Sequence, residues 1–207
     1  SVACWGLNNY GQLGDGTTTN RLTPTQTLSL GRPAVAVEAG SHFSTCALLD
    51  NGSVSCWGRN HKGQLGRGIT NSTANLSQRT PALTLPMPGD LPVVALDISH
   101  YMVCGVLSDG SIACWGQYGG GNTPSLQTFF NSSNPAIDVS TGRYAGCGLL
   151  ENGSVTCWGT GWLGTGGETQ SANAGVIWPN LGPGRTAVEV EMGRKHRCVL
   201  LDDDSVK

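Results

Sequence analysis

Three stretches of the chain show the same pattern of apolar and polar positions. Each has an apolar run, a turn of the Asn-Gly or Asp-Gly type, and a second run in which apolar and small polar residues alternate. Such a pattern on both sides of a tight turn is a strong β-hairpin signal. The three stretches are Thr45–Gly58, Val103–Gly116 and Gly146–Gly159. We therefore predict three hairpins of one design.

The hairpins belong to a longer repeat. The motif S-[VI]-x-C-W-G recurs at intervals of 52, 58 and 43 residues. A period of about fifty residues, with four strand-like segments in each unit, favours a β-propeller over a helical solenoid. The motif divides the chain into repeats 1–52, 53–110, 111–153 and 154–204, and Asp204–Lys207 opens a fifth copy.

Composition narrows the function classes. Charged residues make up 13% of the chain, about half of the usual ~25%. The formal net charge of -2 gives no basic footprint for nucleic acid. No apolar run approaches the ~18 residues of a membrane span. No local motif indicates a catalytic set, a metal site or a cofactor, so we expect a protein that is not an enzyme and uses no cofactor.

Glycine-rich segments carry a family resemblance. The pattern W-G-x-N-x-x-G-Q-L-G-x-G is intact at Trp5–Gly16 and at Trp57–Gly68. Together with the hairpin that follows, it resembles the repeats of the regulator of chromosome condensation (RCC1) family. The pattern is degraded after Trp115 and after Trp158.

That resemblance implies an all-β propeller, usually seven-bladed, with each blade assembled from adjoining repeats. Four repeats are too few for seven blades. We therefore expect residues 1–207 to form one RCC1-like propeller or part of one, and a fragment of a longer ring more than a small closed ring. The first residue, Ser1, also fits a trimmed or partial chain.

Six of the eight cysteines flank the hairpin turns, ten positions apart. A three-residue turn loop places the first cysteine of each pair directly opposite the second. Opposed strand residues have Cβ atoms ~4.5–5.5 Å apart, close to what a disulfide needs. The alternative is three pairs of small buried thiols. We predict the disulfides Cys46–Cys56, Cys104–Cys114 and Cys147–Cys157.

Cys4 and Cys198 each match one of the two cysteine positions of the hairpin pattern. Cys198 aligns with the first cysteine of a hairpin and Cys4 with the second. If the two ends meet in one blade, Cys4–Cys198 is a fourth disulfide and the ring is closed. Otherwise each cysteine lost its partner at a truncated boundary, which is the outcome we expect.

A cationic residue precedes each hairpin and in three of the four repeats stands beside an aromatic one. On equivalent loops of a propeller these residues would form an arc on one face, and Arg, His and Tyr on a rigid rim can serve as contact hot spots. The alternative is that the aromatic rings pack between blades while the cations are solvated. The candidate binding face comprises His42, Phe43, His100, Tyr101, Arg143, Tyr144, Arg194 and Lys195. We expect Trp5, Trp57, Trp115 and Trp158 to be blade core.

Paired cysteines and glycosylation signals together favour an extracellular or cell-surface location. Three Asn-x-Ser/Thr sequons lie in polar insertions, at Asn71, Asn75 and Asn131. Two others, at Asn51 and Asn152, are explained as turn residues.

We therefore expect a non-enzymatic extracellular module that binds protein or glycan through its propeller loops. The family resemblance implies an alternative, which is Ran-type nucleotide exchange with chromatin binding. A secreted propeller-type enzyme inhibitor is a further alternative.

Overall fold

The fold is all-β, as expected. The structure is a computed structural model that describes residues 1–69, 78–130, 133–161, 170–177 and 179–207. Its strands are β1 (Ala3–Gly6), β2 (Arg21–Gln26), β3 (Ala34–Gly40), β4 (Ser44–Leu49), β5 (Val54–Gly58), β6 (Gln78–Leu83), β7 (Val93–Ile98), β8 (Met102–Leu107), β9 (Ile112–Gly116), β10 (Gly121–Leu126), β11 (Ala136–Thr141), β12 (Ala145–Leu150), β13 (Val155–Gly161), β14 (Gln170–Ile177), β15 (Ala187–Met192) and β16 (Arg197–Leu201). One short 3-10 turn, Pro88–Asp90, precedes β7.

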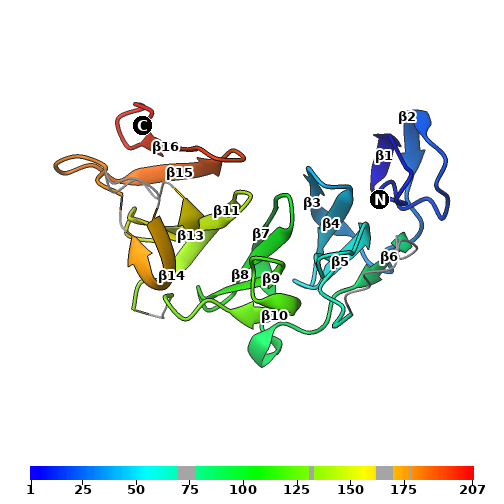
Figure 1. Cartoon of the computed structure of the whole chain (residues 1–207), viewed down its shortest axis with the longest axis horizontal. Coiled ribbons are helices and arrows are strands. Elements are labelled where there is room, and N and C mark those ends of the chain that lie inside the picture. Colours follow the sequence, from blue (N-terminus) through cyan, green and yellow to red (C-terminus); the bar gives the residue numbers. More distant parts are fainter. Residues whose placement is uncertain (70–77, 131–132, 162–169, 178) are drawn as a thin grey trace.

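The strands form five antiparallel sheets in chain order. Three sheets are complete and have four strands each: β3–β6, β7–β10 and β11–β14. Two sheets at the ends have two strands each, β1–β2 and β15–β16. The sheets stand side by side in an open arc with the two chain ends far apart (Figure 1). The first strands of neighbouring sheets, β3, β7, β11 and β15, contact one another along the arc.

Each complete sheet joins strands from two adjoining repeats, because the hairpin crosses the repeat boundary. The central strands β4 and β5 are buried along their whole length, and apolar side chains of neighbouring sheets form the core between them. Proline interrupts hydrogen bonding in a strand and is confined to edges. Accordingly, Pro24, Pro81 and Pro124 lie in β2, β6 and β10, the outermost strands of their sheets.

The hairpin turns have the predicted three-residue loop. Gly52 has a φ of 77°, a left-handed conformation that glycine adopts without strain. Its amide donates to the carbonyl of Leu49 at 2.9 Å, and β4 and β5 then pair Cys46 with Cys56. The three predicted disulfides are present, with Cα–Cα distances of 4.1, 4.1 and 4.0 Å.

Cys4 and Cys198 are free cysteines. Cys4 lies in β1 and Cys198 in β16, and these strands belong to the two sheets at opposite ends of the arc (Figure 1). The three complete sheets stand between them. The alternative of a ring closed by a Cys4–Cys198 bond is therefore not the arrangement that this structure adopts.

The glycine-rich loop of one repeat covers the tryptophan of the next. The indole Nε1 of Trp57 donates to the carbonyl of Gln12 at 2.9 Å, and that of Trp115 donates to the carbonyl of Gln64 at 3.1 Å. Both rings are fully buried. Trp158 follows the degraded loop and packs instead against Phe130, with ring centroids 5.3 Å apart.

Trp5 departs from the expected role as blade core. Its side chain is 62% exposed, because the described residues contain no preceding glycine-rich loop to cover it.

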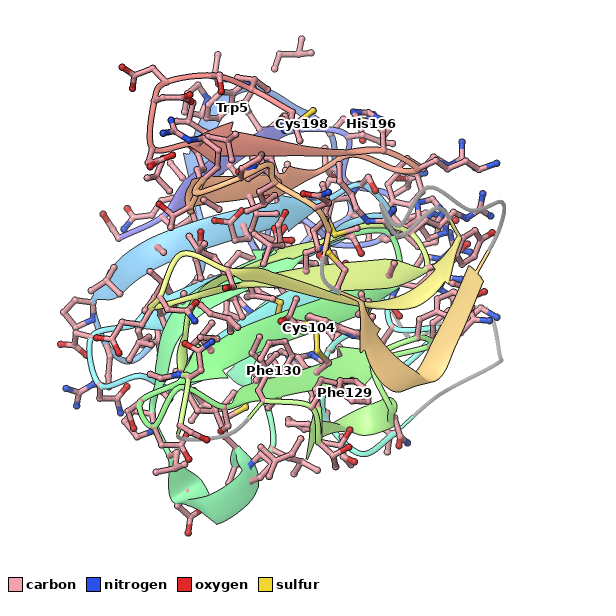
Figure 2. The ribbon with its side chains drawn as sticks, turned by 90° about the vertical axis from the view of Figure 1, so that its left-hand side faces the viewer. Trp5, Cys104, Phe129, Phe130, His196 and Cys198 are labelled. Carbon is pink, nitrogen blue, oxygen red and sulfur yellow. A yellow bond between two sulfur atoms is a disulfide. The ribbon has the colours of Figure 1, made fainter. Side chains whose placement is uncertain are left out.

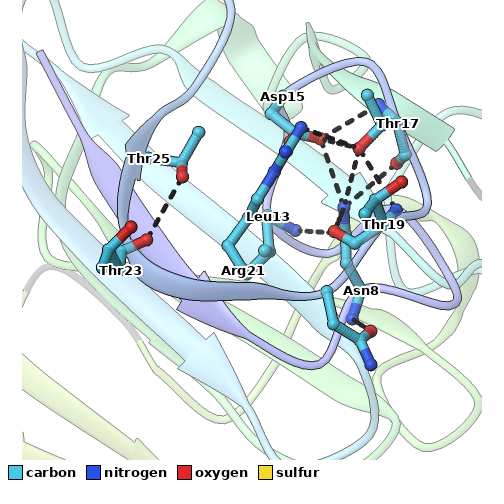
Figure 3. Close-up of polar contacts among 9 residues, drawn as sticks. Asn8, Leu13, Asp15, Thr17, Thr19, Arg21, Thr23 and Thr25 are labelled. Carbon is cyan, nitrogen blue, oxygen red and sulfur yellow. Dashed lines mark hydrogen bonds and ion pairs between the residues drawn. The ribbon is translucent and has the colours of Figure 1, made fainter.

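The asparagine of the W-G-x-N pattern organises this loop. Asn8 is buried, and its Oδ1 accepts from the amide of Leu13 at 3.0 Å. Its Nδ2 donates to the carbonyl of Thr19 at 3.1 Å and to Asp15 Oδ1 at 3.2 Å (Figure 3). Asn60 makes the equivalent bond with the amide of Leu65. The motif therefore has a structural role, which is to shape the loop.

The sequons Asn71, Asn75 and Asn131 lie outside the described residues, so their glycosylation stays a prediction.

The hairpin disulfides should contribute measurably to stability. Replacing both Cys104 and Cys114 by Ala removes a bond that closes a short loop, so the free energy of unfolding should fall by about 2–3 kcal/mol. Urea unfolding followed by tryptophan fluorescence measures this change. The matched control is Cys198→Ala at an exposed free cysteine, where we expect less than about 0.5 kcal/mol. Equal midpoints for both variants would contradict the prediction.

Candidate functional site

The candidate site is a rim of loops at one end of the inner strands. Its residues come from the turns that join the first and second strands of each sheet, and from the loops that follow the third strand. A groove of about 470 Å³ opens here between the ends of β3, β7, β11 and β15. The rim is therefore built from equivalent positions of successive repeats.

Three histidines and a tyrosine form the centre of the rim. The imidazole of His42 lies 4.2 Å from that of His100 and 5.2 Å from that of His61, measured between ring centroids. The ring of Tyr101 packs edge-on against His42 at 4.6 Å and against His61 at 5.3 Å. These side chains come from two neighbouring repeats, so the cluster exists only because the sheets stand side by side.

Arg59 extends the cluster toward the N-terminal end. One of its guanidinium nitrogens lies 2.8 Å from Nε2 of His42. The guanidinium carbon is 4.6 Å from the ring centroid of Tyr10 and 6.0 Å from that of Phe43. The rings of Tyr10 and Phe43 are themselves stacked at 5.0 Å. Arg59 thus lies over the ring of Tyr10 at a distance typical of a cation–π interaction.

Phe43 has a φ of 64°. A bulky residue rarely adopts this left-handed conformation, which costs of order 1–3 kcal/mol and is concentrated at functional positions. The carbonyl of Phe43 accepts from the amide of Arg59 at 2.8 Å, which links the turn to the loop after β5.

A second cation–aromatic group lies farther along the arc. The guanidinium of Arg143 is 4.8 Å from the ring centroid of Tyr144, and Tyr118 packs edge-on against Tyr144 at 4.9 Å. The amide of Arg143 donates to the carbonyl of Arg194 at 3.4 Å. Lys195 is exposed on the turn beside Arg194.

The cations of the rim have no carboxylate partner among the described residues. Ion pairs occur elsewhere, for example between Arg21 and Asp15 and between Arg32 and Asp50. Burial, followed by repulsion from neighbouring cations, lowers the pKa of His42 and of His61 to about 4. The same causes lower the pKa of His100.

Carboxylates lie on the inner strands below the rim. Burial, and then repulsion between neighbouring carboxylates, raises the pKa of Glu38, Glu191 and Asp138. Burial also raises the pKa of Asp97, whose Oδ2 accepts from the amide and the hydroxyl of Thr141 at 2.5 Å each. Asp97 thereby ties β7 to β11. The groove consequently has a cationic mouth and an acidic floor.

The rim has the composition of a contact surface. Within the described part of the chain, no group of three or more His, Cys, Asp or Glu side chains is placed to hold a metal ion. None of the described helices is long and apolar enough to cross a membrane. The rim residues offer hydrogen bonding, charge and aromatic contact.

Seven of the eight predicted face residues lie on this rim in contact with one another or beside the groove, and Lys195 stands apart. Sequence reasoning missed Tyr10, Arg59, His61 and Tyr118. All four follow the tryptophan in the W-G-x-N loop, so the signal was present, but only the fold brings that loop against the hairpin turn.

The fold and the rim together define a β-propeller repeat protein with a cation–aromatic loop face. Sequence profiles of the regulator of chromosome condensation (RCC1) repeat match residues 1–47, 34–64 and 136–161. The RCC1 repeat is therefore matched over residues 1–64 and 136–161, which agrees with the expected resemblance.

Relatives and solved structures agree with this assignment. The chain is 48% identical to the human probable E3 ubiquitin-protein ligase HERC4 over 67 residues, which cover 31% of this chain and 6% of HERC4. Its fold is similar to that of human WBSCR16, with a TM-score of 0.80 and 20% identity over 98% of this chain and 55% of the other. It is equally similar to the structure of Kap60 bound to yeast RCC1 (Prp20), with a TM-score of 0.80 and 22% identity over 99% of this chain and 50% of the other. The chain thus spans about half of each solved chain and a small part of HERC4.

The histidine cluster should make stability depend on pH. The folded-state pKa of His42 and His61 is about 4, below the value of about 6.5 in the unfolded chain. Between these values the unfolded chain binds protons that the folded chain does not, so the stabilisation present above pH ~6.5 is lost as the pH falls toward 4. The raised carboxylate pKa values act in the opposite direction, so variants are needed to isolate the histidines.

The test compares melting temperatures at about pH 7.5 and about pH 5. We expect His61→Gln to reduce the acid-induced drop relative to the unmodified chain. His196→Gln, at an exposed histidine on the β15–β16 turn, is the matched control and should leave the drop unchanged. An identical drop in all three proteins would rule out the cluster as its cause.

Proposed function

We propose that the chain is a non-enzymatic protein-interaction module whose rim binds an anionic surface of a partner protein. The observation that carries the proposal is the state of Arg59 and Arg143. Each guanidinium is held on an aromatic ring, and neither has a carboxylate partner among the described residues. Both are therefore oriented before binding, and an incoming carboxylate would meet them with little further loss of side-chain freedom.

The surrounding rings favour a protein partner over a glycan. Tyr, Arg and His beside one another on rigid turns are typical of interaction hot spots. Tyr101 and Tyr144 are half-buried, so each offers an apolar face as well as a hydroxyl group. A protein partner also agrees with the yeast RCC1 structure, in which a chain of similar fold is bound to Kap60.

We further propose that the chain functions outside the reducing cytosol, in an extracellular or cell-surface setting. Support comes from the three disulfides, since regularly spaced structural disulfides persist in oxidising compartments. Ran-type nucleotide exchange is not proposed, because an identity of 22% to yeast RCC1 carries the fold alone.

The rim arginines should control binding of an acidic ligand. A fluorescent polyglutamate peptide serves as the probe in an anisotropy titration, with polylysine as the reverse-charge control. Replacing both Arg59 and Arg143 by Ala should raise the Kd for polyglutamate by about tenfold or more, equivalent to about 1.4 kcal/mol. Arg32→Ala, beyond the far end of β4 and paired with Asp50, should leave the Kd unchanged. An equal rise in Kd for the double variant and for Arg32→Ala would show that total charge, and not the rim, controls binding.

The oxidation state tests the proposed compartment. The chain is recovered from its native source in the presence of iodoacetamide, and its peptides are analysed by mass spectrometry without reduction. We expect the six hairpin cysteines to be unlabelled and joined in the three pairs described above. Alkylated Cys46 and Cys56 would argue against an oxidising compartment and leave the binding face untouched.

A further inference from the structure

The hairpin turns share one side-chain arrangement at their tips. In the turn between β4 and β5, Oδ1 of Asn51 accepts from the amide and from the hydroxyl of Ser53, at 3.2 and 2.7 Å. In the turn between β12 and β13, Oδ1 of Asn152 accepts from the amide of Ser154 at 2.9 Å. A side-chain oxygen that bonds the backbone two residues farther on is a common stabiliser of tight turns. The turn therefore uses the oxygen of each asparagine.

A carboxylate makes the same turn equally well. Oδ1 of Asp109 accepts from the amide and the hydroxyl of Ser111 at 2.9 and 2.6 Å. Asp203 makes the equivalent bonds with Ser205, although it directly follows another acidic residue, Asp202. The turn geometry consequently does not require an amide at this position.

The amide nitrogens of Asn51 and Asn152 are thus left over from the turn. Both residues are exposed, and among the described residues no group accepts a hydrogen bond from either Nδ2. Each asparagine is followed by glycine and serine, which completes an Asn-x-Ser sequon. An exposed and unpartnered amide in this sequence is the acceptor that N-glycosylation uses.

We propose that Asn51 and Asn152 carry N-linked glycans at the tips of two of the three complete sheets. The proposal rests on the extracellular or cell-surface setting proposed above, because this sequon is used in secreted chains. The turn and the modification are compatible, since they use different atoms of one side chain.

The transfer forms one bond and breaks one. Nδ2 of the asparagine bonds to C1 of the first sugar of an oligosaccharide that is linked to a polyprenyl diphosphate. The bond from C1 to the diphosphate oxygen breaks and its electron pair leaves with the diphosphate, while one proton passes from Nδ2 to a base of the transferase. No oxidant or reductant takes part. Asp109 has no such nitrogen, so the equivalent turn between β8 and β9 cannot be modified in this way.

A groove at the first tip offers room for a sugar. Asn51 lines a groove of about 360 Å³ whose walls include Leu83, Leu85 and Pro92. Leu83 is 57% exposed and Leu85 is 41% exposed. The first sugar ring can lay its C–H face over these side chains and remove apolar surface from water.

Glycans at the tips would leave the candidate binding rim open. Strands of successive sheets run in a common direction when the arc is viewed from its end, with Cys104 inside the stack (Figure 2). The rim residues Phe43 and Tyr101 precede β4 and β8, whereas the turn tips follow these strands. The glycans and a partner on the rim would therefore occupy opposite ends of the sheets.

The first test uses the chain recovered from its native source with iodoacetamide. Its peptides are treated with peptide N-glycosidase in water enriched in heavy oxygen, which converts each glycosylated asparagine into a labelled aspartate and separates it from earlier spontaneous deamidation. We expect the label at Asn51 and at Asn152. Intact hairpin disulfides with both asparagines unlabelled would overturn this proposal and leave the proposed compartment standing, whereas alkylated hairpin cysteines would overturn both.

Variants secreted from cultured eukaryotic cells test the two sites one at a time. Asn51→Asp and Asn152→Asp keep the oxygen that the turn uses, and each should lose one glycan by intact mass before and after peptide N-glycosidase. Asp109→Asn is the matched control, because it completes a sequon in a turn of the same geometry and should gain one glycan. An unchanged glycan count in both Asn→Asp variants would overturn the proposal.

A stability measurement tests whether the amide is free of a structural role. In the unglycosylated chain from a bacterial periplasm, Asn51→Asp should change the melting temperature by less than about 1 °C. Asn51→Ala removes the bonds to Ser53 and should lower it by about 2–4 °C. An equal loss in the two variants would show that the turn needs the amide, which would remove the basis of the proposal.

Discussion

The two junctions with an intact glycine-rich loop depend on one contact that passes from a repeat to the next. A tryptophan that is buried between two sheets donates its indole N–H to the backbone of the preceding repeat's loop, as Trp57 does to Gln12. A buried indole without such a partner would leave a donor unsatisfied, so the loop and the sheet that follows it are stabilised together. Nearest-neighbour coupling of this kind is the usual source of stability in repeat proteins.

The contact made by the tryptophan depends on how well the glycine-rich loop is preserved. Where the glycine-rich loop is intact, its asparagine holds the backbone in the shape that meets the tryptophan. Where the loop is degraded, the ring of Trp158 packs edge-on against Phe130 and does not make that hydrogen bond. In the N-terminal sheet neither contact is present among the described residues, and Trp5 is 62% exposed.

The hairpin turns, which stabilise the sheets, and the candidate binding rim lie at opposite ends of the same strands. The hairpin turns that carry Gly52 and its equivalents lie at one end, while the rim of cations and aromatic rings lies at the other. Disulfides across the hairpins brace each of the three complete sheets, which support the rim loops. Burial, followed by repulsion from neighbouring cations, lowers the pKa of the rim histidines. The positive charge of the face then comes from Arg59, Arg143 and Arg194.

Much of the fold could be predicted from local sequence. The alternating hairpin, the left-handed glycine of its turn and the opposed cysteines all depend on residues within about ten positions, so the sequence by itself determined the strands and the three disulfides. The candidate face was predicted in part, because His42, His100 and Arg143 recur at one repeat position. What only the tertiary structure decided was which repeats stand next to one another. The approach of His61 to Tyr101, the aromatic ring under Arg59 and the exposure of Trp5 arise between repeats, at separations that no local pattern encodes.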